Sequence, residues 1–560
     1  SIKSIDASGP RGAFEELMCQ LAQLEQFTGF HEFRRVEGAG GDGGLEAYWL
    51  LETGEKIGYQ AKYFLKSGGI DWSQINGSVE EAFNNHSKLT KYVIAVACDL
   101  TDVTGKRGKT GWEHWKNWSK QWSDKYKKPS GESVEFEIWT ASELSSRLMQ
   151  PEYAGLVKYF FGKTSLTPEW FRTKLDESLA TLDERYTPEH HVNVEVEMVF
   201  HALSRSEDIF NQVYAFKEKI YNWEFLTQVL YKVNNFTFDE QLITKIYQHK
   251  SDFLKIFDEI NLSEYNHWDI NKWSDLTSNF LHIVVQLANI FGYNHKHENY
   301  YSLRQIYQNL SYLEGILNDF KSLINNKYFK CINSNVALIH GSAGTGKSHL
   351  LAKGTLSALK ENHPAILLLG QNFNDEAFGI QISKILELPD FTLDDFLSAM
   401  DVAGKVNRRK SLITIDAINE GIGCRFWSNN LSIFLSKLKK YKNLCCIVSC
   451  RKEYFHLAVS ESLRKCHPTF EIKGFSTYEE QVNAAKVYLD KFNIARPSTP
   501  WLAPEFVNPL FLRSLCNSLK QNNQTEIPTG LQGSTKLLRY YMESISKYIE
   551  NKESIDLLRK

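Results

Sequence analysis

The sequence lacks the features that mark membrane and secreted proteins. None of its apolar runs approaches the roughly 18 residues that a membrane-spanning helix needs, and the N-terminal SIKSIDASGP is not a signal peptide. We therefore expect a cytoplasmic protein without a membrane association. The chain does not begin with Met, so we expect it to be processed or trimmed.

An excess of charge of one sign is also missing. The formal net charge is −2 over 560 residues, which argues against a protein that coats nucleic acid over its whole surface but allows a local basic site. The nine cysteines form no CxxC pair, and most stand in apolar runs such as NLCCIVSC at 443–450. We interpret them as reduced core thiols rather than as disulfides or a zinc site.

Glycine is scarce in the middle of the chain. Only Gly292 and Gly315 lie between Gly162 and Gly341, so little interrupts a helix there. The composition predicts a mostly helical connector over 164–328, although the polar–apolar alternation over 190–200 is compatible with a short strand. A length of 560 residues suggests about three or four domains, and we place them at 1–163, 164–328, 329–478 and 479–560.

Both ends of the connector adjoin α/β patterns. Before it, we expect helices at about 11–26, at Trp72–His86 and from about 111, and strands at Gly44–Leu51, Lys56–Phe64, Tyr92–Cys98 and Val134–Trp139. After it, helical patterns separate four short apolar runs at 336–341, 365–370, 411–416 and 443–450. This alternation predicts a parallel α/β sheet, and residues 479–560 are expected to be helical.

The first of these runs leads into a phosphate-binding loop. Residues 341–348, GSAGTGKS, match GxxxxGK[ST], follow a strand and open a helix at about 349–359. The glycines let backbone N–H groups point at phosphates, Lys347 would reach the β- and γ-phosphates, and the Ser348 hydroxyl would bind Mg²⁺. We expect ATP to contact Gly341, Gly344, Thr345, Gly346, Lys347, Ser348 and His349.

Three charged residues follow later strands of the same sheet. Asp416 ends the third strand, where a buried acid is costly unless it serves a cation, so we expect it to hold the Mg²⁺ of ATP through water. Glu420 is a candidate for polarising the attacking water. Arg451 leaves the fourth strand, where it either senses the γ-phosphate or has a structural role.

These motifs resemble the STAND class of NTPases, close to its NACHT-like members. The resemblance covers about 329–560 and rests on GSAGTGKS, LITIDAINE, CIVSCRKEYF and VNPLFL. It implies that ATP acts mainly as a switch for oligomerisation, that Arg451 is the sensor and that Pro509 contacts the adenosine. It also implies a winged-helix segment and a C-terminal sensor; neither is obvious before Lys560, so we expect part of the protein to be missing from this sequence.

A second group of polar residues stands near the N-terminus. The expected hairpin carries Asp42 and Glu46 at its entry, and Gln60 and Lys62 lie two residues apart on one face of its second strand. Carboxylates and an amide oxygen suit Mg²⁺, and the lysine would offset charge on a phosphate. Glu15, on the preceding helix, is a candidate for holding a metal-bound water. A solvated charged hairpin explains the same residues, so both interpretations stay open.

The order of elements resembles the Mrr-like branch of the PD-(D/E)xK nuclease superfamily. The matching pieces are FEEL, GGDGGLE and YQAKYF, and Gln in place of the acid before the lysine is common in that branch. The branch usually carries Asp where Glu46 stands, so whether Asp42 or Glu46 is the main metal ligand stays open. The resemblance implies a Mg²⁺-dependent DNA endonuclease with a restriction-endonuclease-like α/β fold.

Charge within this domain is uneven. Residues 1–160 hold 19 Lys and Arg against 22 Asp and Glu, a net of −3, whereas 101–130 have a net of +5. The lysines of that segment are candidates for binding double-stranded DNA, with a solvated charged helix as the alternative. Trp112, Trp115, Trp118 and Trp122 share a helix face that we expect to pack in the core rather than to stack on bases.

A nuclease, a helical connector and a STAND NTPase in this order resemble the Avs antiviral NTPases of bacteria, as does LDERYTPEHHVNVEVEM at 182–198, more weakly. The resemblance implies a phage protein as the trigger, with the portal protein as a candidate. It further implies that ATP-bound protomers assemble as tetramers and that the gathered nuclease domains degrade DNA. Two other functions stay open: a restriction-type enzyme that uses ATP for translocation or modified-base recognition, and a signalling scaffold with an inactive nuclease.

Overall fold

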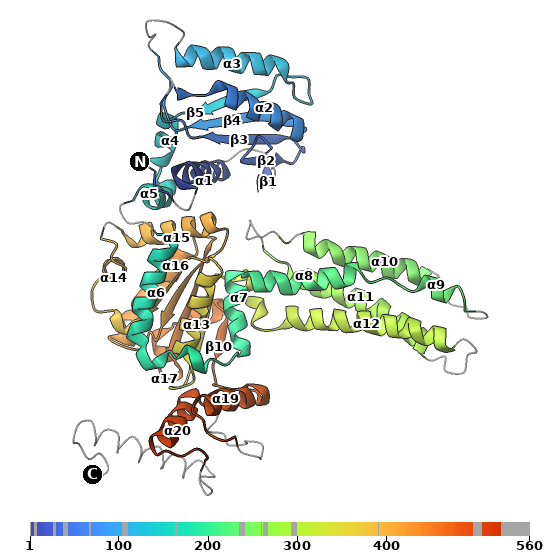
Figure 1. The fold of residues 1–560 in the computed structure, drawn as a ribbon, viewed down its shortest axis with the longest axis vertical. Coiled ribbons are helices and arrows are strands. Elements are labelled where there is room, and N and C mark those ends of the chain that lie inside the picture. Colours follow the sequence, from blue (N-terminus) through green and yellow to red (C-terminus); the bar gives the residue numbers. More distant parts are fainter. Residues whose placement is uncertain are drawn as a thin grey trace. The chain divides into compact units, whose positions relative to one another are not determined.

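The structure is a computed structural model, drawn in Figure 1. It describes residues 2–4, 8–25, 30–36, 43–66, 69–102, 110–162, 166–233, 241–258, 260, 267–292, 300–389, 391–496 and 507–527. The chain forms two compact units, one made of 1–167 with 391–406 and the other of 168–390 with 407–560. Within the described residues each unit contains one five-stranded sheet.

The sheet of the first unit has the strand order β1-β2-β3-β4-β5. The pairs β1–β2 and β2–β3 are antiparallel, whereas β4 joins β3, and β5 joins β4, in parallel. The expected hairpin is β2–β3, and of the five strands of this sheet only the edge strand β1 was not predicted. The strands are β1 (Phe30–Arg35), β2 (Ala47–Leu51), β3 (Lys56–Lys62), β4 (Leu89–Val96) and β5 (Glu135–Trp139).

Helices cover both faces of this sheet, with α1 and α3 on opposite sides in Figure 1. The face of α3 that carries Trp115, Trp118 and Trp122 packs with α2 against the buried residues Tyr92 and Ile94 of β4. The helices of the unit are α1 (Gly9–Gln23), α2 (Trp72–Asn85), α3 (Gly111–Lys125), α4 (Ala141–Leu148), α5 (Ala154–Phe161) and, over residues 393–406, α15 (Leu393–Asn407).

The sheet of the second unit is wholly parallel, as the sequence predicts, with the order β10-β6-β9-β8-β7. Its inner strands are apolar and buried, because helices cover both faces of a parallel sheet. β10 is the strand that the sequence analysis missed. The strands are β6 (Val336–Gly341), β7 (Ala365–Leu369), β8 (Ser411–Asp416), β9 (Leu444–Arg451) and β10 (Thr469–Glu471).

The helices around this sheet include α6 and α13, both of which contact β7. They are α6 (Pro168–Leu182), α7 (Met198–Ser204), α13 (Lys347–Lys360), α14 (Phe378–Ile385), α16 (Gly423–Leu438), α17 (Lys452–Ala458), α18 (Glu461–Cys466), α19 (Tyr478–Lys491) and α20 (Pro509–Gln521). The expected helices after 479 are thus present in the described part, and residues 528–560 lie outside it.

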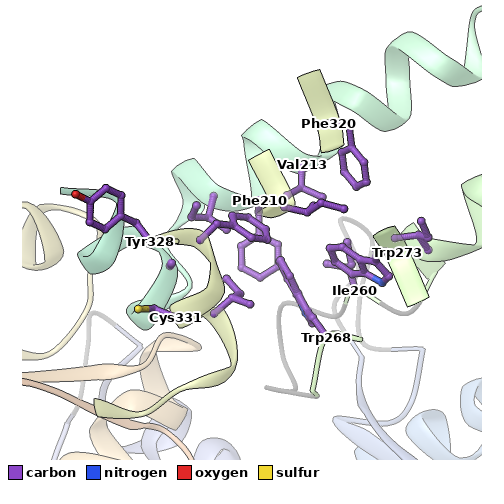
Figure 2. Close-up of a cluster of buried hydrophobic side chains, with 14 of the residues drawn as sticks. Phe210, Val213, Ile260, Trp268, Trp273, Phe320, Tyr328 and Cys331 are labelled. Carbon is purple, nitrogen blue, oxygen red and sulfur yellow. The ribbon is translucent and has the colours of Figure 1, made fainter. Parts of the chain in front are cut away.

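The connector is mostly helical, as predicted. Figure 1 shows α8, α10, α11 and α12 side by side in an elongated bundle, and α11 and α12 make the most extensive helix–helix contact of the chain's described part. Figure 2 shows its aromatic core, in which Phe210, Trp268, Trp273 and Phe320 pack together. The helices are α8 (Glu207–Tyr221), α9 (Thr227–Leu230), α10 (Gln241–Leu254), α11 (Ile270–Gly292) and α12 (Tyr300–Asn325).

The short strand considered over 190–200 is wrong. Residues 188–190 and 195–197 form single turns of 3-10 helix, and α7 begins at Met198. The alternation has another cause: Val192 and Val196 are buried against neighbouring helices, without a strand to pair with among the described residues.

Seven of the nine cysteines are buried, as expected of core thiols, whereas Cys424 is half-buried and Cys466 is exposed. Among the helices that the structure describes, not one is long and apolar enough to cross a membrane.

Candidate functional site

The phosphate loop of the second unit connects β6 to α13. Gly344 and Gly346 have φ angles of +77° and +89°, which favour glycine because an L side chain is strained there. A Cβ on Gly341 would lie 2.4 Å from the carbonyl oxygen of Ile472, so this strand end also requires glycine. The Thr345 hydroxyl donates to the Ser342 carbonyl at 3.0 Å and closes the loop on itself. The strand–loop–helix context that the motif requires is therefore present.

Lys347 is the buried cation of the loop. Its side chain is 8% exposed, and its Nζ donates to the carbonyl oxygens of Gly341 and Ser342, both at 2.7 Å. Burial lowers the pKa of Lys347, and the charge of Asp416 opposes that shift. The ammonium is therefore held at the mouth of the loop by groups that leave its charge available to an anion.

Asp416 lies at the carboxyl end of β8, with β9 between it and the loop strand β6. It is 1% exposed; its Oδ1 accepts a hydrogen bond from the Ser449 hydroxyl at 2.5 Å, and its buried Oδ2 has no hydrogen-bond partner within the described part of the chain. Burial raises the pKa of Asp416, whereas the hydroxyls of Ser348 and Ser449 lower it. A buried carboxylate oxygen without a donor, beside the Ser348 hydroxyl, fits the oxygen ligands that Mg²⁺ prefers.

Glu420 bridges two arginines. Arg451 Nη2 lies 3.1 Å from Glu420 Oε1, and Arg185 Nη1 lies 2.9 Å from Glu420 Oε2. The Asn419 side chain fixes the Arg451 backbone, because its Oδ1 accepts from the Arg451 N–H at 2.8 Å. The structure thus brings Glu420 and Arg451 together and adds Arg185, which the sequence analysis did not identify.

A cavity of about 410 Å³ adjoins the loop. The loop and the start of α13 form one end of it. The other walls come from residues distant in sequence, namely the 187–197 segment, the turn after β10, and α19 and α20. Of the residues expected to bind ATP and its Mg²⁺, all except Gly341 and Asp416 line this cavity. The lining also includes His190, His191, Val192, Gly474, Tyr488, Leu510 and Arg513.

His190 and His349 occupy different places in that wall. The buried ring of His190 stacks on Tyr488, with centroids 4.9 Å apart, and burial lowers its pKa. His349 stacks on His191 at 5.5 Å, and its Nε2 lies 3.3 Å from His191 Nδ1. Burial and, next, the neighbouring His191 lower the pKa of His349 to about 4. The sequence analysis did not predict that these histidines line the cavity. The only hint in the sequence is EHHVNV, in which two adjacent histidines precede alternating valines.

The N-terminus of α20 lies directly against the loop. Leu510 N–H donates to the Gly344 carbonyl at 3.3 Å, and Asn508 Nδ2 donates to the Ala343 carbonyl at 3.4 Å. A Cβ placed on Gly346 would lie 3.6 Å from Pro509 Cγ. Pro509 therefore lines the cavity, next to the loop.

In the first unit the hairpin brings three of the expected residues to one place. Gln60 Nε2 donates to Glu46 Oε1 at 2.7 Å, and the Tyr92 hydroxyl lies 3.2 Å from Gln60 Oε1. Gln60 and Lys62 are 1% and 8% exposed, so they do not belong to a solvated face. The same Tyr92 hydroxyl donates to the Gly44 carbonyl at 2.8 Å and ties down the glycine-rich entry.

Of the two other expected hairpin-site residues, Glu15 is not part of this group. Glu15 is held on α1 by Arg11, whose Nε donates to it at 2.9 Å. Phe14 next to it contacts Tyr63, which follows β3, at a ring distance of 5.6 Å; α1 therefore packs on the side of β3 opposite to Gln60 and Lys62. Asp42 lies outside the described residues.

The tryptophans of the basic segment are mainly core residues. Trp115, Trp118 and Trp122 are buried, as expected, whereas Trp112 is 43% exposed. Lys125 pairs with Glu80 at 2.9 Å. Lys106, Arg107 and Lys109 lie outside the described residues.

No family model and no curated protein matches this chain. The solved structures that show similarity include AMPPCP-bound DnaA from Aquifex aeolicus, katanin in a study of its self-assembly, and PCH-2 from C. elegans. DnaA is 19% identical over 40% of this chain, with a TM-score of 0.23. Katanin is 14% identical over 40% of this chain, with a TM-score of 0.23. PCH-2 is 10% identical over 50% of this chain, with a TM-score of 0.24. The alignments span 57%, 76% and 70% of the respective other chains, so just over half of DnaA is matched. TM-scores this low do not establish a shared fold.

Proposed function

We propose that this protein is an ATP-dependent STAND-type switch that controls an N-terminal, Mg²⁺-dependent DNA endonuclease in bacterial defence against phage. The observation that carries the proposal is the convergence of Lys347, Ser348 and Asp416 at the carboxyl ends of parallel strands, beside a cavity of about 410 Å³. Ligands of open parallel sheets bind at this edge.

Different residues around the cavity bind different parts of ATP. Lys347 and the loop N–H groups bind the phosphates, and Ser348 and Asp416 hold Mg²⁺, which supplies positive charge to the phosphate oxygens when it is bound. His190, Tyr488 and Pro509 form an aromatic and apolar wall for the adenosine. Glu420 positions the attacking water. Arg451 and Arg185 both form ion pairs with Glu420, which places them to respond to the γ-phosphate.

The hairpin site of the first unit carries out the proposed cleavage of DNA. Glu46 and the Gln60 side chain hold Mg²⁺ together with Asp42, and Lys62 offsets the charge that develops on the scissile phosphate. The burial of Gln60 and Lys62 favours this reading over a solvated hairpin, because an unneeded buried lysine is costly.

Assembly couples the two activities. The net charge of −3 over residues 1–160 gives a single copy weak attraction to double-stranded DNA, so several copies are needed to hold it. A phage protein, for which the portal protein is the candidate, triggers the assembly of ATP-bound protomers into a tetramer.

A plasmid-cleavage assay with Mg²⁺ and ATP, on the protein extended by the C-terminal sensor that is expected to bind the trigger, with and without phage portal protein, tests this proposal. Wild type plus the portal protein should cut plasmid DNA, and both Lys62→Ala and Lys347→Ala should reduce cutting at least a hundredfold. The matched controls are Lys66→Ala after β3 and Lys360→Ala at the end of α13, because both lysines are exposed and should leave cutting unchanged.

The outcomes separate the alternatives. If Lys62→Ala still cleaves DNA, the proposed nuclease site is wrong. If DNA stimulates ATP hydrolysis without a protein trigger, the protein is the restriction-type enzyme. Protection of cells that is lost with Lys347→Ala but kept with Lys62→Ala indicates a signalling scaffold.

A further inference from the structure

A cluster of potential metal ligands lies in the second unit, away from the cavity at the phosphate loop. His201 is on α7, Asp208 is in the first turn of α8, and Glu361 is the residue at which α13 ends. One ligand atom of each lies within 4.8 Å of the others. The cluster therefore joins the start of the helical connector to the far end of the helix that the phosphate loop opens.

A fourth side chain, His363, lies beside Glu361 of this cluster. The side chain of His363 is fully buried, and its Nδ1 lies 2.9 Å from the Lys410 carbonyl oxygen, which places the proton on Nδ1 and the lone pair on Nε2. That Nε2 lies 4.0 Å from Glu361 Oε2, and neither atom has a hydrogen-bond partner within the described residues. A histidine whose second nitrogen is fixed by a backbone carbonyl is the usual arrangement of a metal ligand.

Space and charge suit one small cation. A cavity of about 20 Å³ next to the cluster is lined by His201, Ser206 and Glu361 but not by Asp208 or His363, and about 10–15 Å³ suffices for one water-sized occupant. Lys353 lines the same cavity, and Arg409 is engaged by Glu207 at 3.2 Å. Asp208, Glu361 and Glu207 thus outnumber the two cations by one charge.

We propose that His201, Asp208, Glu361 and His363 form a Zn²⁺ site. Two imidazole nitrogens and two carboxylates make a four-ligand set that Zn²⁺ accepts. Ligand atoms in such a tetrahedron lie about 3.3–3.6 Å apart. The ligand atoms of His201, Asp208 and Glu361, now within 4.8 Å of one another, and His363 Nε2, 4.0 Å from Glu361 Oε2, must therefore move closer when the ion binds. The bound ion clamps α7 and α8 to the end of α13.

The test uses the full chain after treatment with a chelator and titration with Zn²⁺ alone, in the absence of nucleotide. The number of Zn²⁺ ions bound per chain is measured by equilibrium dialysis, together with the shift in Tm. Wild type should bind one ion more than Asp208→Asn and His363→Gln, and its Tm should rise with Zn²⁺ by several degrees more. His282→Gln, which removes an exposed histidine of α11, should behave like wild type.

Asp208→Asn decides the question if His363→Gln does not fold, because the Asp208 side chain is 61% exposed and its replacement leaves the core intact. Equal numbers of bound Zn²⁺ ions and equal shifts in Tm for wild type and Asp208→Asn overturn the proposal. Co²⁺ gives a further readout: a tetrahedral visible spectrum in wild type that Asp208→Asn lacks supports the site, and identical spectra count against it.

Discussion

Single residues at the phosphate loop are set by their hydrogen bonds as much as by the motif. Ser449 is such a residue: its hydroxyl donates to Asp416 Oδ1 at 2.5 Å and accepts from the Ala417 N–H at 2.8 Å. This hydrogen bond lowers the pKa of a carboxyl group whose pKa burial raises, and it orients the carboxylate so that the other oxygen remains for a cation. Ser449 belongs to no motif that we used, because its role depends on the pairing of β8 with β9.

Ser449→Ala should weaken the use of Mg²⁺. Without the hydroxyl, the pKa of Asp416 rises further above its usual value, and the oxygen facing Mg²⁺ is less negative. We expect ATP hydrolysis at limiting Mg²⁺ to fall about tenfold and to recover partly at high Mg²⁺, the equivalent of about 1.4 kcal/mol. Ser462→Ala, an exposed serine of α18, is the control. An unchanged Mg²⁺ dependence would show that Asp416 does not serve the cation.

His349 should make the second unit sensitive to acid. Because its pKa in the folded chain is about 4, below the ordinary value of 6.5, it contributes stability above about pH 6.5 that is lost as the pH falls toward 4. His349→Gln should therefore lose less stability than wild type between about pH 7 and pH 5, by about 1 kcal/mol. Urea unfolding at the two pH values measures the difference, with His282→Gln as control. A variant that parallels wild type at both pH values refutes the role of His349.

At the scale of elements, α3 has a charged, exposed face and an aromatic, buried face. Trp118 shows the burial: its Nε1 donates to Asn76 Oδ1 of α2 at 2.7 Å, and its ring stacks on Trp115 at 5.2 Å. The spacing of the tryptophans predicts this shared face, but the spacing alone does not show that Trp112 stays 43% exposed.

Trp118→Ala and Trp112→Ala separate core packing from base stacking. Trp118→Ala should destabilise the first unit by about 3–5 kcal/mol, because it leaves a cavity between α3, α2 and the sheet. Trp112→Ala should change the free energy of unfolding by no more than about 0.5 kcal/mol. Thermal or urea unfolding gives both values. A Trp112→Ala chain that is fully stable yet binds DNA more weakly would assign base stacking to Trp112.

At the scale of the whole molecule, the proposed switch requires ATP binding and DNA cleavage to be separable. With ATP and portal protein, wild type should increase in mass to that of a tetramer, and Lys62→Ala should assemble equally well without cutting DNA. Lys347→Ala should remain at its starting mass, because the loop loses its phosphate cation. Mass photometry measures the assembly. Assembly of Lys347→Ala to the wild-type extent would disconnect oligomerisation from ATP.

The sequence by itself determined the elements whose causes are local in the chain. The phosphate loop, the strands β6, β7, β8 and β9 of the second unit, the β2–β3 hairpin and the helical connector follow from glycine placement, apolar runs and periodicity. The juxtaposition of Glu46 with Gln60 also follows, because a hairpin turn fixes its register.

Only the tertiary structure decided the walls of the cavity, the free oxygen of Asp416 and the cluster of His201 with Asp208 and Glu361. These features depend on packing between segments that are not adjacent in the chain, which periodicity does not encode. The segment around His190 illustrates the limit: its alternating valines predict a strand, whereas the packing of the helices turns them into a cavity wall. Glu15 is a second case, since the same helix lies on the opposite side of β3 from the residues that it was expected to join.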